Sequence, residues 1–114
     1  MTPTFMGSEP TFAAQGQYAG TRVFDDELAA RLALINSLTD SQRNQAIVSG
    51  VKPSNNNRGE LFQDNAVVPY QGVKLNTLNE QQKEFAIELI QLYTGQMRSG
   101  YDEIKLTEIL SHWD

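Results

Sequence analysis

Leu-Thr-Asp-Ser-Gln-Arg at residues 38–43 and Leu-Asn-Glu-Gln-Gln-Lys at residues 78–83 are two helix starts of the same design. In each, a leucine precedes a residue that caps helices well, Thr39 or Asn79, and a glutamine follows three residues later. Such a glutamine reaches back to the backbone amide of the capping residue and forms a capping box. Each box stabilises its helix by about 1 kcal/mol. Because capping boxes recur by chance and the flanking sequences differ, the shared start is only weak evidence for an internal repeat.

Hydrophobic periodicity around these starts predicts about four helices. The first runs over 25–37, where Phe24, Leu28, Leu32 and Ile35 form one apolar stripe. The second ends near residues 49–50, the third covers 80–97 and is the longest, and the fourth follows Gly100. Short strands are expected near Thr4 and Val67. The predicted fold class is therefore α+β, predominantly helical.

The charges of the chain have a local explanation. Fourteen acidic residues against nine basic ones give a net charge of −5, and the bases are spread singly along the chain. Seven of the acids fall where a helix is expected to begin, where a carboxylate complements the positive end of the helix dipole. They are Asp25, Asp26, Glu27, Asp40, Glu80, Asp102 and Glu103. Without a basic patch, we expect no nucleic acid partner.

Two features that the sequence lacks limit the kinds of site it can form. The chain has no cysteine, so disulfides, thiolate metal sites and cysteine nucleophiles are excluded. It also has no run of eighteen apolar residues, so no membrane span is expected. The apolar faces of the helices instead favour self-association of the chain.

Three further stretches carry a family resemblance. They are Gly-Glu-Leu-Phe-Gln-Asp-Asn-Ala-Val-Val-Pro-Tyr-Gln-Gly-Val at 59–73, Thr-Pro-Thr-Phe-Met-Gly-Ser-Glu-Pro at 2–10 and Gly-Thr-Arg-Val-Phe at 20–24. Together they resemble a bacterial and fungal family, domain of unknown function number three thousand five hundred. The resemblance implies a longer protein, with a Gly-His-His segment upstream and an aromatic strand ending in Trp-x-Gly-Gly downstream. Residues 1–114 are therefore expected to be a single incomplete segment of a larger domain.

Two candidate ligand-binding residues lie in the stretches at 2–10 and 20–24. Glu9 sits in a Gly-Ser-Glu-Pro turn, where its carboxylate either coordinates a metal ion or caps a backbone amide. Arg22 precedes an acidic helix start and could clamp a substrate carboxylate or phosphate with its planar fork. The alternative for Arg22 is an ion pair with Asp25, Asp26 or Glu9.

Asp64 and Asn65 are the second pair of candidate ligand-binding residues. They lie in an irregular, otherwise apolar segment that matches the family well. Side chains of these types commonly fold a loop by bonding their own backbone, but a long ordered loop is also where scaffolds place binding residues. We expect this segment to fold back toward Glu9 and Arg22.

His112 is the only histidine, so this chain alone cannot form a histidine triad or a complete histidine metal site. Its position matches a His-x-Asp of the family, and the resemblance implies that the upstream Gly-His-His segment and Glu9 could complete a metal site with it. The alternative is a histidine that complements the dipole at a helix end.

Two functional hypotheses follow. In the first, the chain is part of an enzyme, with a metal-dependent site shared by Glu9, Arg22, Asp64, Asn65, His112 and segments outside the chain. In the second, it is a non-catalytic helical scaffold or interaction module. No motif in the sequence selects a reaction, a substrate or a cofactor.

Overall fold

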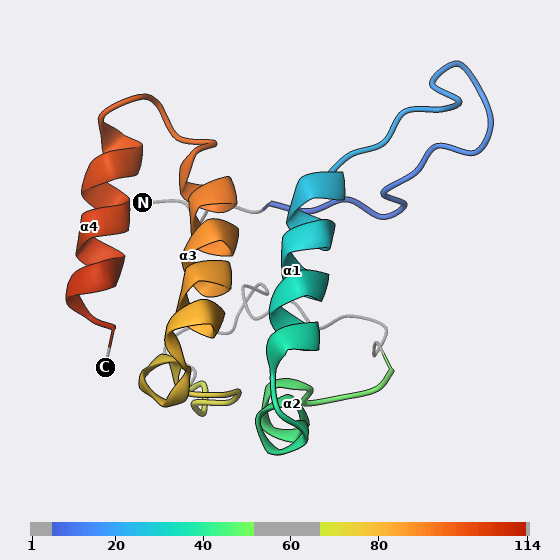
Figure 1. Ribbon diagram of the computed structural model, residues 1–114. Coiled ribbons are helices and arrows are strands. Elements are labelled where there is room, and N and C mark those ends of the chain that lie inside the picture. The colour runs from blue at the N-terminus through green and yellow to red at the C-terminus, as the bar shows by residue number, and fades with distance from the viewer. Residues whose placement is uncertain (1–5, 52–66, 114) are drawn as a thin grey trace.

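The computed structural model describes residues 6–51 and 67–113, which are predominantly helical. The helices are α1 (Asp25–Ser37), α2 (Asp40–Ala46), α3 (Glu80–Thr94) and α4 (Tyr101–Ser111), with a short 3-10 turn, η1 (Leu75–Thr77), ahead of α3. Helices α1, α3 and α4 stand side by side in one layer, each antiparallel to its neighbour (Figure 1). Helix α3 lies in the middle and contacts both of the others.

The strands expected from the sequence are not confirmed, and with them the α+β assignment. The strand near Thr4 falls outside the described residues. Val67 and Val68 are described and form no strand. Both side chains are exposed, and no strand among the described residues pairs with this segment. The one β-bridge of the described chain joins Phe12 to Arg22.

The helix starts follow the sequence prediction closely. Both capping boxes are formed, with Thr39 and Asn79 accepting hydrogen bonds from the backbone amides of Gln42 and Gln82. All seven acids predicted at helix starts lie in the first turns of α1, α2, α3 and α4. The bounds predicted for α1 are also those observed.

Two helices end earlier than the sequence predicts. Helix α2 stops at Ala46, and Ile47 already has extended backbone angles. The β-branched pair Ile47 and Val48 disfavours continuation, because such side chains are crowded against the preceding helical turn. Helix α3 stops at Thr94, where Gly95 begins the turn toward α4.

The buried core is small and sits where the two helix starts meet. Leu38 and Leu78, the leucines that precede the two capping residues, are buried together with Ala86 of α3. Half-buried side chains surround this cluster; they are Leu34, Ile35, Ala46, Val73, Leu75 and Trp113. The core therefore ties α1, α2 and α3 together at one end of the layer, close to the last residues described after α4.

Candidate functional site

Residues 7–23, here called the arm, carry two of the predicted site residues and project from the start of α1 (Figure 1). Backbone hydrogen bonds fold the arm into a narrow two-stranded loop. The Val23 amide donates to the Thr11 carbonyl over 2.9 Å, and the Ala13 amide donates to the Thr21 carbonyl, also over 2.9 Å. These bonds flank the Phe12–Arg22 bridge, so the two bridged side chains are close cross-strand neighbours.

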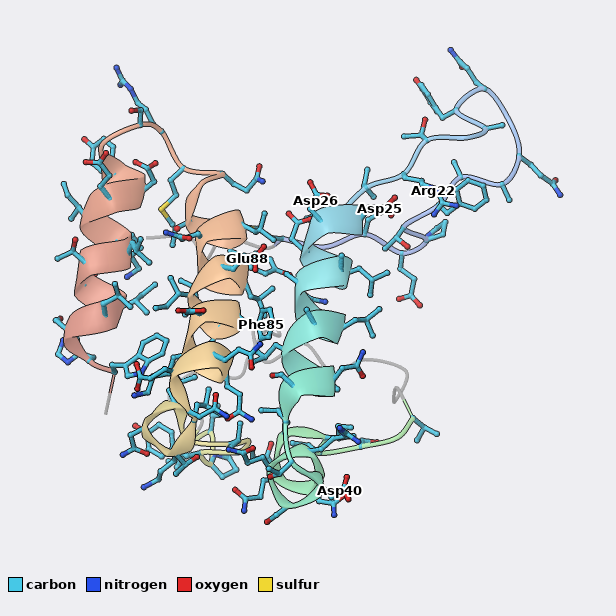
Figure 2. All side chains as sticks on the ribbon, in the orientation of Figure 1. Arg22, Asp25, Asp26, Asp40, Phe85 and Glu88 are labelled. Atoms are coloured by element: carbon cyan, nitrogen blue, oxygen red, sulfur yellow. The ribbon has the colours of Figure 1, made fainter. Side chains whose placement is uncertain are left out.

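Arg22 makes the local contacts that its structural alternative predicts. Its guanidinium lies 4.5 Å from the centre of the Phe12 ring, and a guanidinium nitrogen lies 3.8 Å from a carboxylate oxygen of Asp25. Figure 2 shows Arg22 on the arm close to Asp25 at the start of α1. Both side chains of the ion pair are at least half exposed, so the pair contributes no more than about 1 kcal/mol. Arg22 thus fastens the arm to α1 and still faces solvent.

Glu9 is exposed and lies near the base of the same arm. The turn around it is held by the Ser8 hydroxyl, which donates to the Pro10 carbonyl over 2.8 Å. The structure therefore brings Glu9 and Arg22 onto one element. Asp64 and Asn65 lie outside the described residues, and their approach to the arm stays a prediction.

His112 lies at the end of α4, on the opposite side of the molecule from the arm (Figure 1). Its backbone amide donates to the Ile109 carbonyl over 3.1 Å. The pKa of nearby Glu108 is held below its ordinary value, mainly by the hydrogen bond and positive charge of Lys105 and to a smaller extent by the charge of His112. Within the described residues, the structure does not bring His112 together with Glu9 or Arg22. Over residues 6–51 and 67–113, no three histidine, aspartate or glutamate side chains are placed where they could hold a metal ion.

A pocket of about 420 Å³ lies where the arm meets the helices. The two ends of the arm, the first turn of α1 and the turn after α3 all line it; its residues are Met6, Gly7, Val23, Phe24, Glu27 and Gln96. Glu27 is only 7% exposed, the most unusual burial for a charged residue in the described chain. From the sequence, Glu27 is expected to be an ordinary helix-start acid and Gln96 has no expected role. No sequence signal pairs these two residues, because they come together only where α1 packs beside α3.

A second hollow, of about 440 Å³, lies between α1 and α3. Alanines at 29, 30 and 33 form its α1 side, and Phe85 and Leu92 form its α3 side. Asp26 and Glu88 are its two charged residues, and Figure 2 shows Glu88 and Phe85 on the side of α3 that faces α1. The hollow exists because small side chains of α1 meet larger ones of α3, which leaves space between the helices.

These features define a predominantly helical chain with an arm, a pocket at the base of that arm and no assembled catalytic group within the described residues. The chain belongs to the family described as Protein of unknown function (DUF3500), which matches residues 1–114. Comparison with curated proteins and with solved structures gave no match. No helix in the described part of the chain has both the length and the apolar character needed to cross a membrane.

Proposed function

We propose that this chain is a non-catalytic helical interaction module that pairs with a second copy of itself through the outer face of α1. The observation that carries this proposal is the exposure of two leucines, Leu28 and Leu32, at 49% and 53%. They lie one turn apart on the same face of α1. Ala30 and Leu34 take the opposite face toward α3 and the core.

The layered architecture explains why such a face needs a partner. A domain is stable when each apolar helix stripe is buried against a second layer. Helices α1, α3 and α4 form one layer (Figure 1), and Leu28 and Leu32 of α1 stay about half exposed in it. Placing the outer face of α1 against another apolar surface would remove both leucines from water.

A second copy of α1 fits this face by charge. The helix begins with two exposed acids, Asp25 and Asp26, and at its other end the guanidinium of Arg43 donates to the carbonyls of Ile35 and Leu38. In a two-fold dimer with antiparallel α1 helices, the acidic start of each helix lies near Arg43 of the other copy. A helix of 13 residues is about 20 Å long, so this contact is short and the dimer is expected to be weak.

Sedimentation velocity of the purified chain over a range of concentrations tests the proposal. We expect a reversible monomer–dimer equilibrium that Leu32→Glu shifts to monomer, because the substitution places a charge at the centre of the contact. Ile104→Glu is the matched control, since Ile104 is 66% exposed but lies on α4. A monomer at every concentration, or a dimer that only Ile104→Glu disrupts, would contradict pairing through α1.

The metal-dependent enzyme hypothesis gains no supporting geometry from the described residues. Glu9 and Arg22 share the arm, whereas His112 lies at the far end of α4 (Figure 1). The hypothesis depends on Asp64, Asn65 and segments outside this chain. Both this site and the expectation that residues 1–114 belong to a larger domain stay predictions.

A further inference from the structure

We propose that the pocket at the base of the arm binds an organic cation, an ammonium group carried on an apolar stem. The proposal rests on Glu27, an acidic residue that is nearly buried and yet lines a pocket with apolar walls. It goes beyond the proposed self-association and does not depend on it, because Leu28 and Leu32 do not line this pocket.

Glu27 is nearly buried, and its carboxylate has no hydrogen-bond or ion-pair partner in the described chain. No hydrogen bond or ion pair joins it to any residue that the structure describes. Every fully buried side-chain nitrogen or oxygen among the described residues does have a partner. The carboxylate oxygens of Glu27 therefore keep some access to solvent, and Glu27 itself is one of the residues that line the pocket. A carboxylate withdrawn from most of its water gains strongly from a cation placed beside it.

The two arginines nearest to Glu27 in sequence are engaged elsewhere. Arg31 lies one turn further along α1, where it could form a helical ion pair with Glu27. Its guanidinium instead donates to the Tyr93 hydroxyl and lies 5.5 Å from the centre of the Tyr93 ring. Arg22 is held by Phe12 and Asp25. Neither arginine neutralises Glu27.

The local charge favours a cation over an anion. The start of a helix carries roughly half a positive charge, which by itself attracts anions. Three carboxylates in the same turn, Asp25, Asp26 and Glu27, outweigh it, and only Asp25 has an ion-pair partner among the described residues. The formal charges of this turn therefore favour a cation at the pocket.

The remaining walls match the stem of the proposed ligand. Met6, Val23 and Phe24 provide apolar surface for an alkyl chain. The Gln96 side chain supplies a carbonyl oxygen that can accept a second hydrogen bond from an ammonium group. An apolar pocket with a few convergent polar groups is the usual form of a small-ligand site.

An NMR titration of the ¹⁵N-labelled chain with n-butylammonium tests the proposal, with n-butanol as the uncharged probe of the same size. We expect saturable shifts of the Val23, Phe24, Glu27 and Gln96 amides with n-butylammonium only. Glu27→Gln should weaken binding by about tenfold or more, because it removes a charge-assisted hydrogen bond. Glu103→Gln, which removes an exposed acid of α4, should leave binding unchanged.

A second pair of probes distinguishes a free amine from a lysine side chain. They are an end-capped Ala-Ala-Lys-Ala-Ala peptide and its norleucine counterpart. Tighter binding of the lysine peptide than of n-butylammonium assigns the pocket to a protein side chain, and the reverse order assigns it to a free amine.

Should Glu27→Gln unfold the chain, Val23→Trp fills the pocket instead and should abolish the shifts. Equal binding of n-butanol, full affinity in a folded Glu27→Gln variant, or no saturable shift with either amine would overturn the proposal. Leu32→Glu should retain amine binding even if it abolishes the dimer.

Discussion

Gln42 and Gln82 exchange side-chain hydrogen bonds across the junction of α2 and α3. The amide nitrogen of Gln42 lies 3.3 Å from the side-chain oxygen of Gln82, and the amide nitrogen of Gln82 lies 3.1 Å from the side-chain oxygen of Gln42. Each of these oxygens also accepts the backbone amide of its own capping residue, over 3.0 Å in both cases. The two capping boxes are thus joined into one polar network.

The contacts around this network repeat in both helix starts. Gln82 donates to the carbonyl of Ser37 over 2.8 Å, and Gln42 donates to the carbonyl of Thr77 over 3.1 Å. Each carbonyl belongs to the residue two positions before a capping residue. The first turns also carry equivalent ion pairs, Asp40 with Arg43 and Glu80 with Lys83. Segments 37–46 and 77–86 are therefore related by an approximate two-fold arrangement. The sequence similarity of the two helix starts, which alone is weak evidence for an internal repeat, thus corresponds to equivalent contacts in the structure.

We predict that Gln82→Ala destabilises the chain by about 2–3 kcal/mol, because Gln82 is only 2% exposed and its removal leaves buried partners unsatisfied. Gln42→Ala should cost less, about 1 kcal/mol, since Gln42 is half-buried and water can replace its bonds. Urea denaturation followed by circular dichroism measures both. Gln45→Ala, an exposed glutamine of α2, is the matched control and should be nearly neutral. A larger loss for Gln42 than for Gln82 would show that the buried glutamine is not the centre of the network.

Tyr93→Phe should destabilise the α1–α3 contact by about 1 kcal/mol, because it removes the hydroxyl that accepts the Arg31 hydrogen bond. The ring and its contact with the guanidinium remain in this variant. Thermal unfolding compared with Tyr101→Phe, which changes an exposed tyrosine of α4, isolates the effect. Equal melting temperatures for the two variants would show that the hydrogen bond between Arg31 and Tyr93 does not stabilise the helical layer.

The carboxyl group of Glu108 should titrate below its ordinary pKa of 4.5, because Lys105 hydrogen-bonds to its charged form. A pKa lowered by folding contributes stability above the unfolded-state pKa, and this contribution is lost as the pH falls through the folded-state pKa. Carboxyl ¹³C NMR should show the pKa of Glu108 rising toward the ordinary value in Lys105→Gln and at high salt. If the pKa of Glu108 is the same in Lys105→Gln and in the parent chain, the exposed pair is not formed in solution.

Short-range signals made most of the helical framework predictable. The bounds of α1, the two capping boxes and the seven first-turn acids depend on residues within one or two turns of each other. The Arg22–Asp25 ion pair is equally local. The outward orientation of Leu28 and Leu32, in contrast, depends on which face of α1 meets α3. The Gln42–Gln82 network and the pocket around Glu27 depend on pairings between distant parts of the chain, which no local pattern encodes.

The arm should loosen when its attachment to α1 is removed. Arg22→Ala deletes both the contact with the Phe12 ring and the ion pair with Asp25, which together contribute about 1 kcal/mol at this exposed position. Hydrogen exchange of the Ala13 and Val23 amides, which bond across the arm, should accelerate about fivefold. Exchange within α3 should not change, because the arm opens without unfolding the helices.

Arg98→Ala provides the control for loss of one positive charge. If Arg22→Ala accelerates exchange in α3 as much as in the arm, the two open as one cooperative unit, and Arg22 supports the whole fold and not the arm alone.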